Sequence, residues 1–166
     1  MRISPSRRSA RASLKGIGRG KRFVLIASQF HRPLALALIR GASTVLKRSG
    51  ASASNIQLLW VPGAFELPVV AARAARLRPP PDAIIALGAL IRGQTPQYEV
   101  LAHAVAQGLS QVAVSARLPV SFGLIVAETV AQANARAGGA EGNRGEEAAL
   151  AALAVLRLFG ELRSST

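Results

Sequence analysis

Two segments of the chain place glycine, proline and polar residues directly after an apolar run, and both could bind an anion. They are residues 60–68 (WVPGAFELP) and residues 87–99 (LGALIRGQTPQYE). In open α/β sheets, ligands bind where loops follow the carboxyl ends of the strands. The N–H groups of such a loop, and of the helix that follows it, face an incoming anion. One loop of this kind is weak evidence, whereas two of them predict a shared ligand site.

Individual side chains in and near these segments suggest what the site could do. Phe30 could stack on a flat heterocycle or fill the core at a strand end, and Glu66 could accept hydrogen bonds from hydroxyls or stabilise a helix start. Thr95 is a candidate anion donor, and Arg92 and Arg136 are candidate phosphate clamps. The sequence offers no Ser-His-Asp or Cys-His set and no close pair of carboxylates. Its chemistry would therefore depend on orienting substrates rather than on a strong nucleophile.

The composition excludes several other kinds of site. The 166 residues contain no cysteine, so there is no disulfide framework and no thiolate metal site, and a cytoplasmic protein is expected. The two histidines, His31 and His103, lie far apart, so no catalytic metal is expected. No apolar run is long enough to span a bilayer. Because half of the residues are hydrophobic, the chain should form a globular body with a substantial core.

The N-terminal segment is strongly basic. Residues 1–22 hold eight Lys and Arg residues and no acid, in a chain whose net charge is +13. The simplest interpretation is a solvated, disordered tail over residues 1–20, followed by one domain over residues 21–166. A contact with nucleic acid or another anionic surface is a second interpretation. An organelle transit peptide, rich in Arg and Ser and free of acids, is a third.

Apolar periodicity predicts four strands that alternate with helices. The expected strands are residues 23–27, 56–61, 82–87 and 119–126, and the expected helices are residues 33–49, 64–77, 97–116, 129–137 and 146–162. Residues 138–145 should form a polar, glycine-rich loop. This alternation predicts a flavodoxin-like α/β fold with three layers, α/β/α, around a four-stranded parallel sheet. The carboxyl ends of the strands would then share one edge, where both loop segments converge.

Three segments taken together resemble lumazine synthase, the penultimate enzyme of riboflavin biosynthesis. They are residues 61–68 (VPGAFELP), 87–96 (LGALIRGQTP) and 135–145 (ARAGGAEGNRG), and their order and spacing extend the resemblance over residues 22–160. The resemblance implies condensation of 5-amino-6-(D-ribitylamino)uracil with 3,4-dihydroxy-2-butanone 4-phosphate to 6,7-dimethyl-8-ribityllumazine, phosphate and water, with no cofactor or metal. Family members are homopentamers with active sites at subunit boundaries, and some build a 60-subunit shell.

The resemblance also implies a role for each matching position. The pyrimidine and its ribityl chain would be bound by Phe30, Ala64, Phe65, Glu66, Ala89, Leu90, Ile91 and Phe122. The phosphate would be bound by Gln94, Thr95 and Arg136. Within these sets Phe30 would stack on the ring and Glu66 would accept the ribityl hydroxyls. Phe122 and Arg136 would reach the site from a neighbouring subunit.

The chain departs from the family at the position expected to transfer protons. After Pro96 the family usually has a histidine, whereas this chain has Gln97, which can hydrogen-bond but cannot act as a general acid or base near neutral pH. Water or the substrate phosphate could move the protons instead. His31, expected on the pyrimidine side, or His103, a helix turn or more beyond Gln97, could also substitute, which is the less favoured alternative. We expect a slower enzyme, because orientation is worth more than acid–base assistance. The alternative is a non-catalytic relative that binds a lumazine-like ligand or forms a shell.

Overall fold

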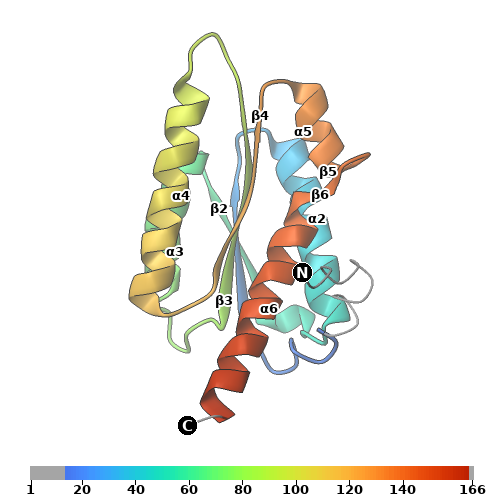
Figure 1. The fold of residues 1–166 in the computed structure, drawn as a ribbon, viewed down its shortest axis with the longest axis vertical. Helices are drawn as coiled ribbons and strands as arrows, with labels where there is room; N and C mark the ends of the chain where they lie inside the picture. Colours follow the sequence, from blue (N-terminus) through green and yellow to red (C-terminus); the bar gives the residue numbers. More distant parts are fainter. Residues whose placement is uncertain (1–13, 165–166) are drawn as a thin grey trace, which may run out of the picture.

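The computed structural model describes residues 14–164, in which strands and helices alternate along the chain (Figure 1). The main elements are β1 (Phe23–Ser28), α2 (Arg32–Arg48), β2 (Ile56–Val61), α3 (Leu67–Ala74), β3 (Ala83–Ile91), α4 (Gln97–Ala116), β4 (Val120–Ala127), α5 (Val130–Arg136), β5 (Ala137–Gly139), β6 (Gly142–Asn143) and α6 (Arg144–Ser164). Two short 3₁₀ helices, η1 (Ala53–Asn55) and η2 (Ala64–Glu66), precede β2 and α3.

Strands β1 to β4 form one parallel sheet in the order β2-β1-β3-β4. Helices α3 and α4 cover one face of this sheet, and α2, α5 and α6 cover the other (Figure 1). The same strand order begins the flavodoxin-like arrangement. The prediction of three α/β/α layers around four parallel strands is therefore confirmed.

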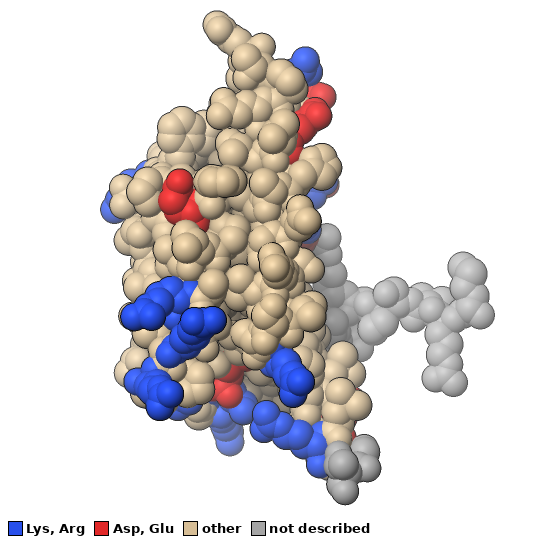
Figure 2. Space-filling view, turned by 90° about the vertical axis from the view of Figure 1, so that its left-hand side faces the viewer, with Lys and Arg blue, Asp and Glu red and all other residues tan. Residues whose placement is uncertain are grey.

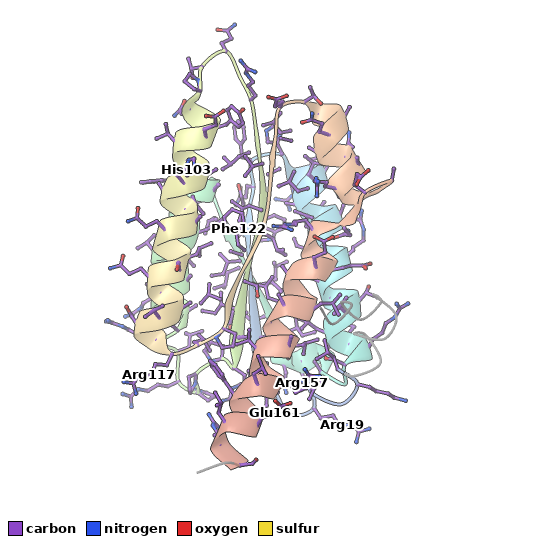
Figure 3. The ribbon with its side chains drawn as sticks, viewed as in Figure 1. Arg19, His103, Arg117, Phe122, Arg157 and Glu161 are labelled. Carbon is purple, nitrogen blue, oxygen red and sulfur yellow. The ribbon has the colours of Figure 1, made fainter. Side chains whose placement is uncertain are left out.

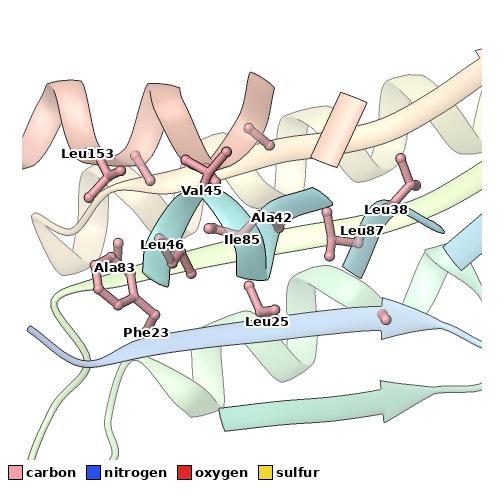
Figure 4. Close-up of a cluster of buried hydrophobic side chains, with 14 of the residues drawn as sticks. Phe23, Leu25, Leu38, Ala42, Val45, Leu46, Ala83, Ile85, Leu87 and Leu153 are labelled. Atoms are coloured by element: carbon pink, nitrogen blue, oxygen red, sulfur yellow. The ribbon is translucent and has the colours of Figure 1, made fainter. Parts of the chain in front are cut away.

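The sheet separates two hydrophobic cores, because successive residues of a strand point to opposite faces. In β1, Phe23 and Leu25 enter the core under α2 and α6, whereas Val24 and Ile26 enter the core under α3 and α4. Figure 4 shows the first of these cores, in which Leu38 and neighbouring α2 side chains lie on the sheet. Full burial of such a side chain is worth about 1.5–3 kcal/mol. Helices thus cover both faces of the central strands, so a ligand can reach the sheet at the ends of its strands.

Strand β3 is longer than its sequence predicts. The expected end was Leu87, before a glycine, but β3 continues to Ile91 and pairs with β4 as far as Ala127. The strand continues through Gly88 because this residue pairs with Leu124 of β4, and Gly88 lies against β1, where a Cβ would come within 3.1 Å of the Ser28 Cβ. The absence of a side chain therefore serves close packing of β1 on β3. As a result, Ala89 to Ile91 belong to the strand and not to the loop after it.

The glycine-rich segment is also more ordered than expected. Instead of a loop over residues 138–145, β5 and β6 form a small antiparallel pair, and α6 begins at Arg144. Asn143 fixes this start, because its Oδ1 accepts hydrogen bonds from Gly145 N (2.9 Å) and Glu146 N (3.2 Å). Its Nδ2 donates to the Ala37 carbonyl in α2 at 3.0 Å. One side chain thereby caps α6 and joins it to α2.

The folded body begins earlier than the expected boundary at residue 21. Leu14 is buried in the core under α2, and the N–H groups of Gly16 and Gly18 donate to the Ser49 carbonyl at 2.9 and 3.0 Å. Residues 14–20 are therefore packed turns and not part of a solvated tail. The rest of the expected tail, residues 1–13, lies outside the described residues. So do the nucleic-acid and transit-peptide interpretations that depend on it.

Charge is unevenly distributed over the described surface. On the face that α3 and α4 cover, Lys and Arg side chains gather towards the amino ends of the strands (Figure 2). Among residues 14–164, none of the helices has both the length and the apolar character that a bilayer crossing requires.

Candidate functional site

The sheet has a topological switch point between β1 and β3. The chain leaves β1 into α2 on one face and leaves β3 into α4 on the opposite face, so a crevice opens between the two crossovers at the carboxyl edge (Figure 1). A cavity of about 600 Å³ lies there, a volume suited to a small-molecule ligand. It is lined by Phe30, His31, Gly63, Ala64, Phe65, Glu66, Ala89, Leu90, Ile91, Gly93, Thr95, Gln97, Tyr98 and Leu101. The loops after β1, β2 and β3 thus contribute to one cavity, whereas the loop after β4, which the sequence also placed there, does not line it.

Two aromatic side chains stand open to solvent at this cavity. Phe30 is 67% exposed and Phe65 is 61% exposed. The interpretation of Phe30 as core filler is therefore wrong, because its ring lies outside both hydrophobic cores. The His31 ring meets the Phe30 ring edge to face, with centroids 4.9 Å apart and planes at 83°. Because the Phe30 ring is exposed and packs against His31, it offers a flat surface on which a heterocycle can stack.

Strand β3 presents an unpaired backbone edge to the same cavity. Its ladder with β1 ends at the Ala27–Leu87 pair, whereas its ladder with β4 continues to Ile91. Within residues 14–164 no other strand pairs with the β1 side of this overhang. The N–H and C=O groups of residues 89–91 that face β1 are therefore available to a ligand. A ring with alternating donors and acceptors at its edge matches such a strand edge.

Glu66 lies half-buried at the end of η2, just before α3. Its Oε2 accepts a hydrogen bond from Gly63 N at 2.8 Å, which holds the turn after β2 and supports the start of η2. This hydrogen bond belongs to the η2 turn; Glu66 is also the N-cap residue of α3, but its side chain makes no capping hydrogen bond to that helix. No hydrogen bond among the described residues engages its Oε1, and Glu66 also lines the cavity. The same carboxylate can thus hold the turn with one oxygen and accept ligand hydroxyls with the other.

The loop between β3 and α4 closes one end of the cavity. Residues 92–97 are exposed, and Thr95 and Gln97 line the cavity, whereas Gln94 does not. Gln97 is the first residue of α4, where unpaired N–H groups and the helix dipole favour an anion. Arg92 faces Glu128 at 3.8 Å, an exposed pair worth at most about 1 kcal/mol. This end of the cavity is therefore suited to a phosphate group.

Two of the expected ligand residues lie elsewhere in the fold. Phe122 pairs with Ala86 in the middle of the sheet, five residues short of the β3 end, and packs half-buried on the core under α3 and α4 (Figure 3). Arg136 ends α5, on the opposite face of the sheet from α4 (Figure 1). Neither residue lines the cavity. Within one chain, the structure therefore brings together the expected site without Phe122, Gln94 and Arg136.

The cavity also contains residues that the sequence did not single out as ligands. Tyr98 is buried and its hydroxyl donates to Glu99 Oε1 at 2.9 Å. This hydrogen bond, together with burial, raises the pKa of the Tyr98 hydroxyl above its usual value. His31 and Leu101 line the cavity as well. Helical spacing could have indicated Tyr98 and Leu101, since both follow Gln97 on one side of α4.

A second cavity of about 590 Å³ lies at the amino edge of the sheet. Arg19, Lys21, Arg117 and Arg163 are among its lining residues. Lys21 is already paired with Asp82 at 3.2 Å. This cavity is remote from the switch point, and none of the expected site residues reaches it. Among residues 14–164 no group of three or more His, Cys, Asp or Glu side chains could hold a metal ion.

The cavity thus brings together an exposed aromatic ring, an open strand edge, a half-buried carboxylate and a helix N-terminus at the switch point of an α/β fold. A family model for 6,7-dimethyl-8-ribityllumazine synthase matches residues 20–160. Relatives with that name come from Gemmatimonas aurantiaca (46% identity, covering 86% of each chain) and Aquifex aeolicus (43%, covering 87% of this chain and 93% of the relative). A third, from Leuconostoc mesenteroides, is 39% identical over 87% of this chain and 92% of its own. The chain belongs to the 6,7-dimethyl-8-ribityllumazine synthase family.

Proposed function

We propose that this protein is a 6,7-dimethyl-8-ribityllumazine synthase. It condenses 5-amino-6-(D-ribitylamino)uracil with 3,4-dihydroxy-2-butanone 4-phosphate and releases phosphate and water. The observation that carries this proposal is the cavity at the switch point, which offers a stacking ring, a strand edge and a helix N-terminus to one ligand set. A pyrimidine, a polyol and a phosphate are the three chemical groups that these features recognise. The absence of cysteine suits the cytoplasm, where we place the reaction.

The lining residues divide between the two substrates. The pyrimidine stacks on Phe30 while its polar edge meets the backbone of residues 89–91, and the ribityl hydroxyls lie beside Ala64, Phe65 and Glu66. The phosphate of the second substrate lies at Thr95 and the N-terminus of α4, with Gln94 in the same loop. This arrangement brings the amine of one substrate to the ketone of the other. Its contribution is orientation, which can supply roughly 7–11 kcal/mol of the barrier.

Gln97 is compatible with a reaction that depends on orientation of the two substrates. Its amide can donate to a phosphate or carbonyl oxygen and accept from an amine, but it cannot carry a proton between them. Acid–base assistance is typically worth about 10²–10⁴-fold, less than orientation can supply. The reactants, an aromatic amine and a ketone with a phosphate that leaves by elimination, are themselves reactive. An enzyme with glutamine here is therefore slower than one with an added imidazole, but active.

The proposal includes a homopentamer whose neighbouring subunits share the active site. Phe122 and Arg136 lie away from the cavity of their own chain, on surfaces that a neighbour could meet. The outer side of α3 and α4 exposes Val69, Val100 and Val114, apolar side chains that subunit contacts would bury. A ring in which Phe122 closes the next subunit's cavity and Arg136 reaches its phosphate completes the ligand set. Assembly of such rings into a 60-subunit shell is a further step that sedimentation would detect.

The test is a direct assay of purified protein with both substrates. Formation of the lumazine is followed by its absorbance against the spontaneous reaction, beside a Gln97→His variant. We expect wild type to exceed the background clearly and the variant to gain moderately, by less than the roughly 10²–10⁴-fold of full acid–base assistance. If wild type only matches the background while still binding a lumazine analogue, the protein is a ligand-binding scaffold and the proposal is wrong.

A further inference from the structure

The proposed reaction must move protons at the pyrimidine end of the cavity. When the amine nitrogen adds to the ketone carbon, both of its protons pass to the carbonyl oxygen, which leaves as water and an imine remains. Loss of a carbon-bound proton then expels phosphate, and closure of the second ring releases another water. No net proton is gained or lost by the protein. A group that accepts a proton and returns it within one turnover would speed each of these steps.

Three side chains that can gain or lose a proton line the cavity, namely His31, Glu66 and Tyr98. Glu66 accepts a hydrogen bond from Gly63 N at 2.8 Å through one oxygen, and the proposed function uses its other oxygen for the ribityl hydroxyls. The Tyr98 hydroxyl donates its proton to Glu99 at 2.9 Å, and this bond raises the Tyr98 pKa further above neutrality. Imidazole is the one group that ordinarily changes charge between pH 5 and 8.

The backbone places His31 at the mouth of the cavity. His31 is the N-cap of α2 and adopts a left-handed conformation, φ 56° and ψ 46°, which costs a residue with a side chain roughly 1–2 kcal/mol. Its ring lies edge to face on Phe30, at 4.9 Å between centroids. A heterocycle stacked on Phe30 would therefore have the imidazole at its rim. Among the described residues, no hydrogen bond engages either nitrogen of this ring, so both are free for a substrate.

Charged neighbours do not block this role. Arg32 follows His31 directly, but its guanidinium lies over the Trp60 ring at 4.5 Å from the centroid, towards β2. Glu66 on η2 and Tyr98 on α4 are the titratable groups that line the same cavity. His103 cannot substitute for His31, because its Nδ1 is hydrogen-bonded to the Glu99 carbonyl at 2.8 Å on the exposed side of α4, outside the cavity (Figure 3).

We propose that His31 is a catalytic residue that relays protons in the condensation, on the substrate side opposite Gln97. This inference rests on the proposed function, because it assigns a group to that reaction. Of the proton carriers that the sequence left open, it selects His31 over water, the substrate phosphate and His103. The imidazole takes a proton from the adding amine nitrogen and gives it to the departing oxygen.

The test replaces His31 by asparagine, which tolerates the left-handed conformation but does not titrate near neutral pH. We expect His31→Asn to lower kcat by about 10²-fold, within the range for acid–base assistance, and to leave KM for the pyrimidine within a few-fold. The pH profile of kcat should lose its limb between pH 5 and 8. His103→Asn is the matched control and should change neither quantity. Adding Gln97→His to the His31→Asn variant should return part of the lost rate.

Three results would overturn the assignment. If His31→Asn keeps both kcat and the pH limb while wild type exceeds the background, His31 does not relay protons and the proposed function stands. If the variant loses its affinity for a lumazine product analogue in proportion to its rate, His31 positions the ligand and is not catalytic. If wild type itself fails to exceed the spontaneous reaction, the proposed function and the assignment fall together.

Discussion

The start of α6 is packed so closely on α2 that one methyl group should destabilise the protein. Gly145 is the second residue of α6 and is buried against Leu38 of α2. A Cβ on Gly145 would meet the Leu38 carbonyl oxygen inside contact distance, with the Leu38 carbonyl carbon at 2.8 Å and its Cα at 2.9 Å. These are backbone atoms, so no change of rotamer can relieve the contact. The helices would have to move apart.

The expected cost of Gly145→Ala follows from two opposing effects. Overpacking of a core ordinarily costs about 1–3 kcal/mol, and a clash with the Leu38 backbone lies at the upper end of this range. Alanine recovers about 1 kcal/mol of helix propensity relative to glycine. We therefore expect a net loss of about 2 kcal/mol in the free energy of unfolding. For a domain of this size, that corresponds to a fall of roughly 4–8 °C in Tm.

Gly160 provides the matched control in the same helix. It lies on the exposed side near the end of α6, and a Cβ there would meet nothing within 4 Å. Gly160→Ala should therefore raise stability by about 0.5–1 kcal/mol. Both variants are compared with wild type by urea unfolding followed by circular dichroism, at one protein concentration because assembly contributes to stability. If Gly145→Ala is as stable as wild type, or if both variants shift in the same direction, the close packing of α2 on α6 is not as described.

Two further predictions concern the cavity. Phe30→Ala should weaken binding of a pyrimidine or lumazine ligand by about 1–2 kcal/mol, because it removes a stacking ring that is not part of either hydrophobic core. This corresponds to a roughly 5–30-fold higher Kd in a fluorescence titration, and an unchanged Kd would exclude stacking on Phe30. Tyr98 is the only tyrosine of the chain, so tyrosinate absorbance reports on it alone, and it should ionise at higher pH in the native protein than in denaturant. The raised pKa contributes stability to the folded state that is fully present below the ordinary tyrosine pKa and is lost as the pH rises through the pKa of native Tyr98. A tyrosinate titration midpoint in the native protein at or below the midpoint in denaturant would contradict the Glu99 hydrogen bond.

The sequence predicted the layers and the sheet because apolar runs and helical spacing are local signals. Its errors arose where distant segments meet. Gly88 was expected to end β3, but the strand continues because residues 88–91 pair with β4. The hairpin before α6 depends on Asn143, whose amide bonds to Ala37 more than a hundred residues away. Neither partner is visible in a local window.

Part of the candidate site was also predictable from local signals in the sequence. Loops after strands predicted which segments converge, and the family resemblance supplied most of the lining residues. Residue type could not settle the position of Phe30, since phenylalanine is usually buried and here stands in solvent. The place of His31 depends on a left-handed backbone that brings its ring onto Phe30, which no spacing rule indicates. Phe122 and Arg136 lie outside the cavity of their own chain, so their predicted roles rest on the proposed pentamer.

That separation has a consequence for inheritance. If the pentamer forms as proposed, each active site takes Phe30 from one subunit and Arg136 from its neighbour. A substitution of Phe30 and a substitution of Arg136 then affect opposite sides of the active site at each subunit boundary. A cell with two defective alleles, one altered at Phe30 and the other at Arg136, would assemble mixed rings. With random mixing, about a quarter of the boundaries receive two intact halves, because each half is intact with a chance of about one in two. A mixture of the two defective chains would then be more active than either chain alone. Activity is then a property of each pair of neighbouring subunits and not of the single chain.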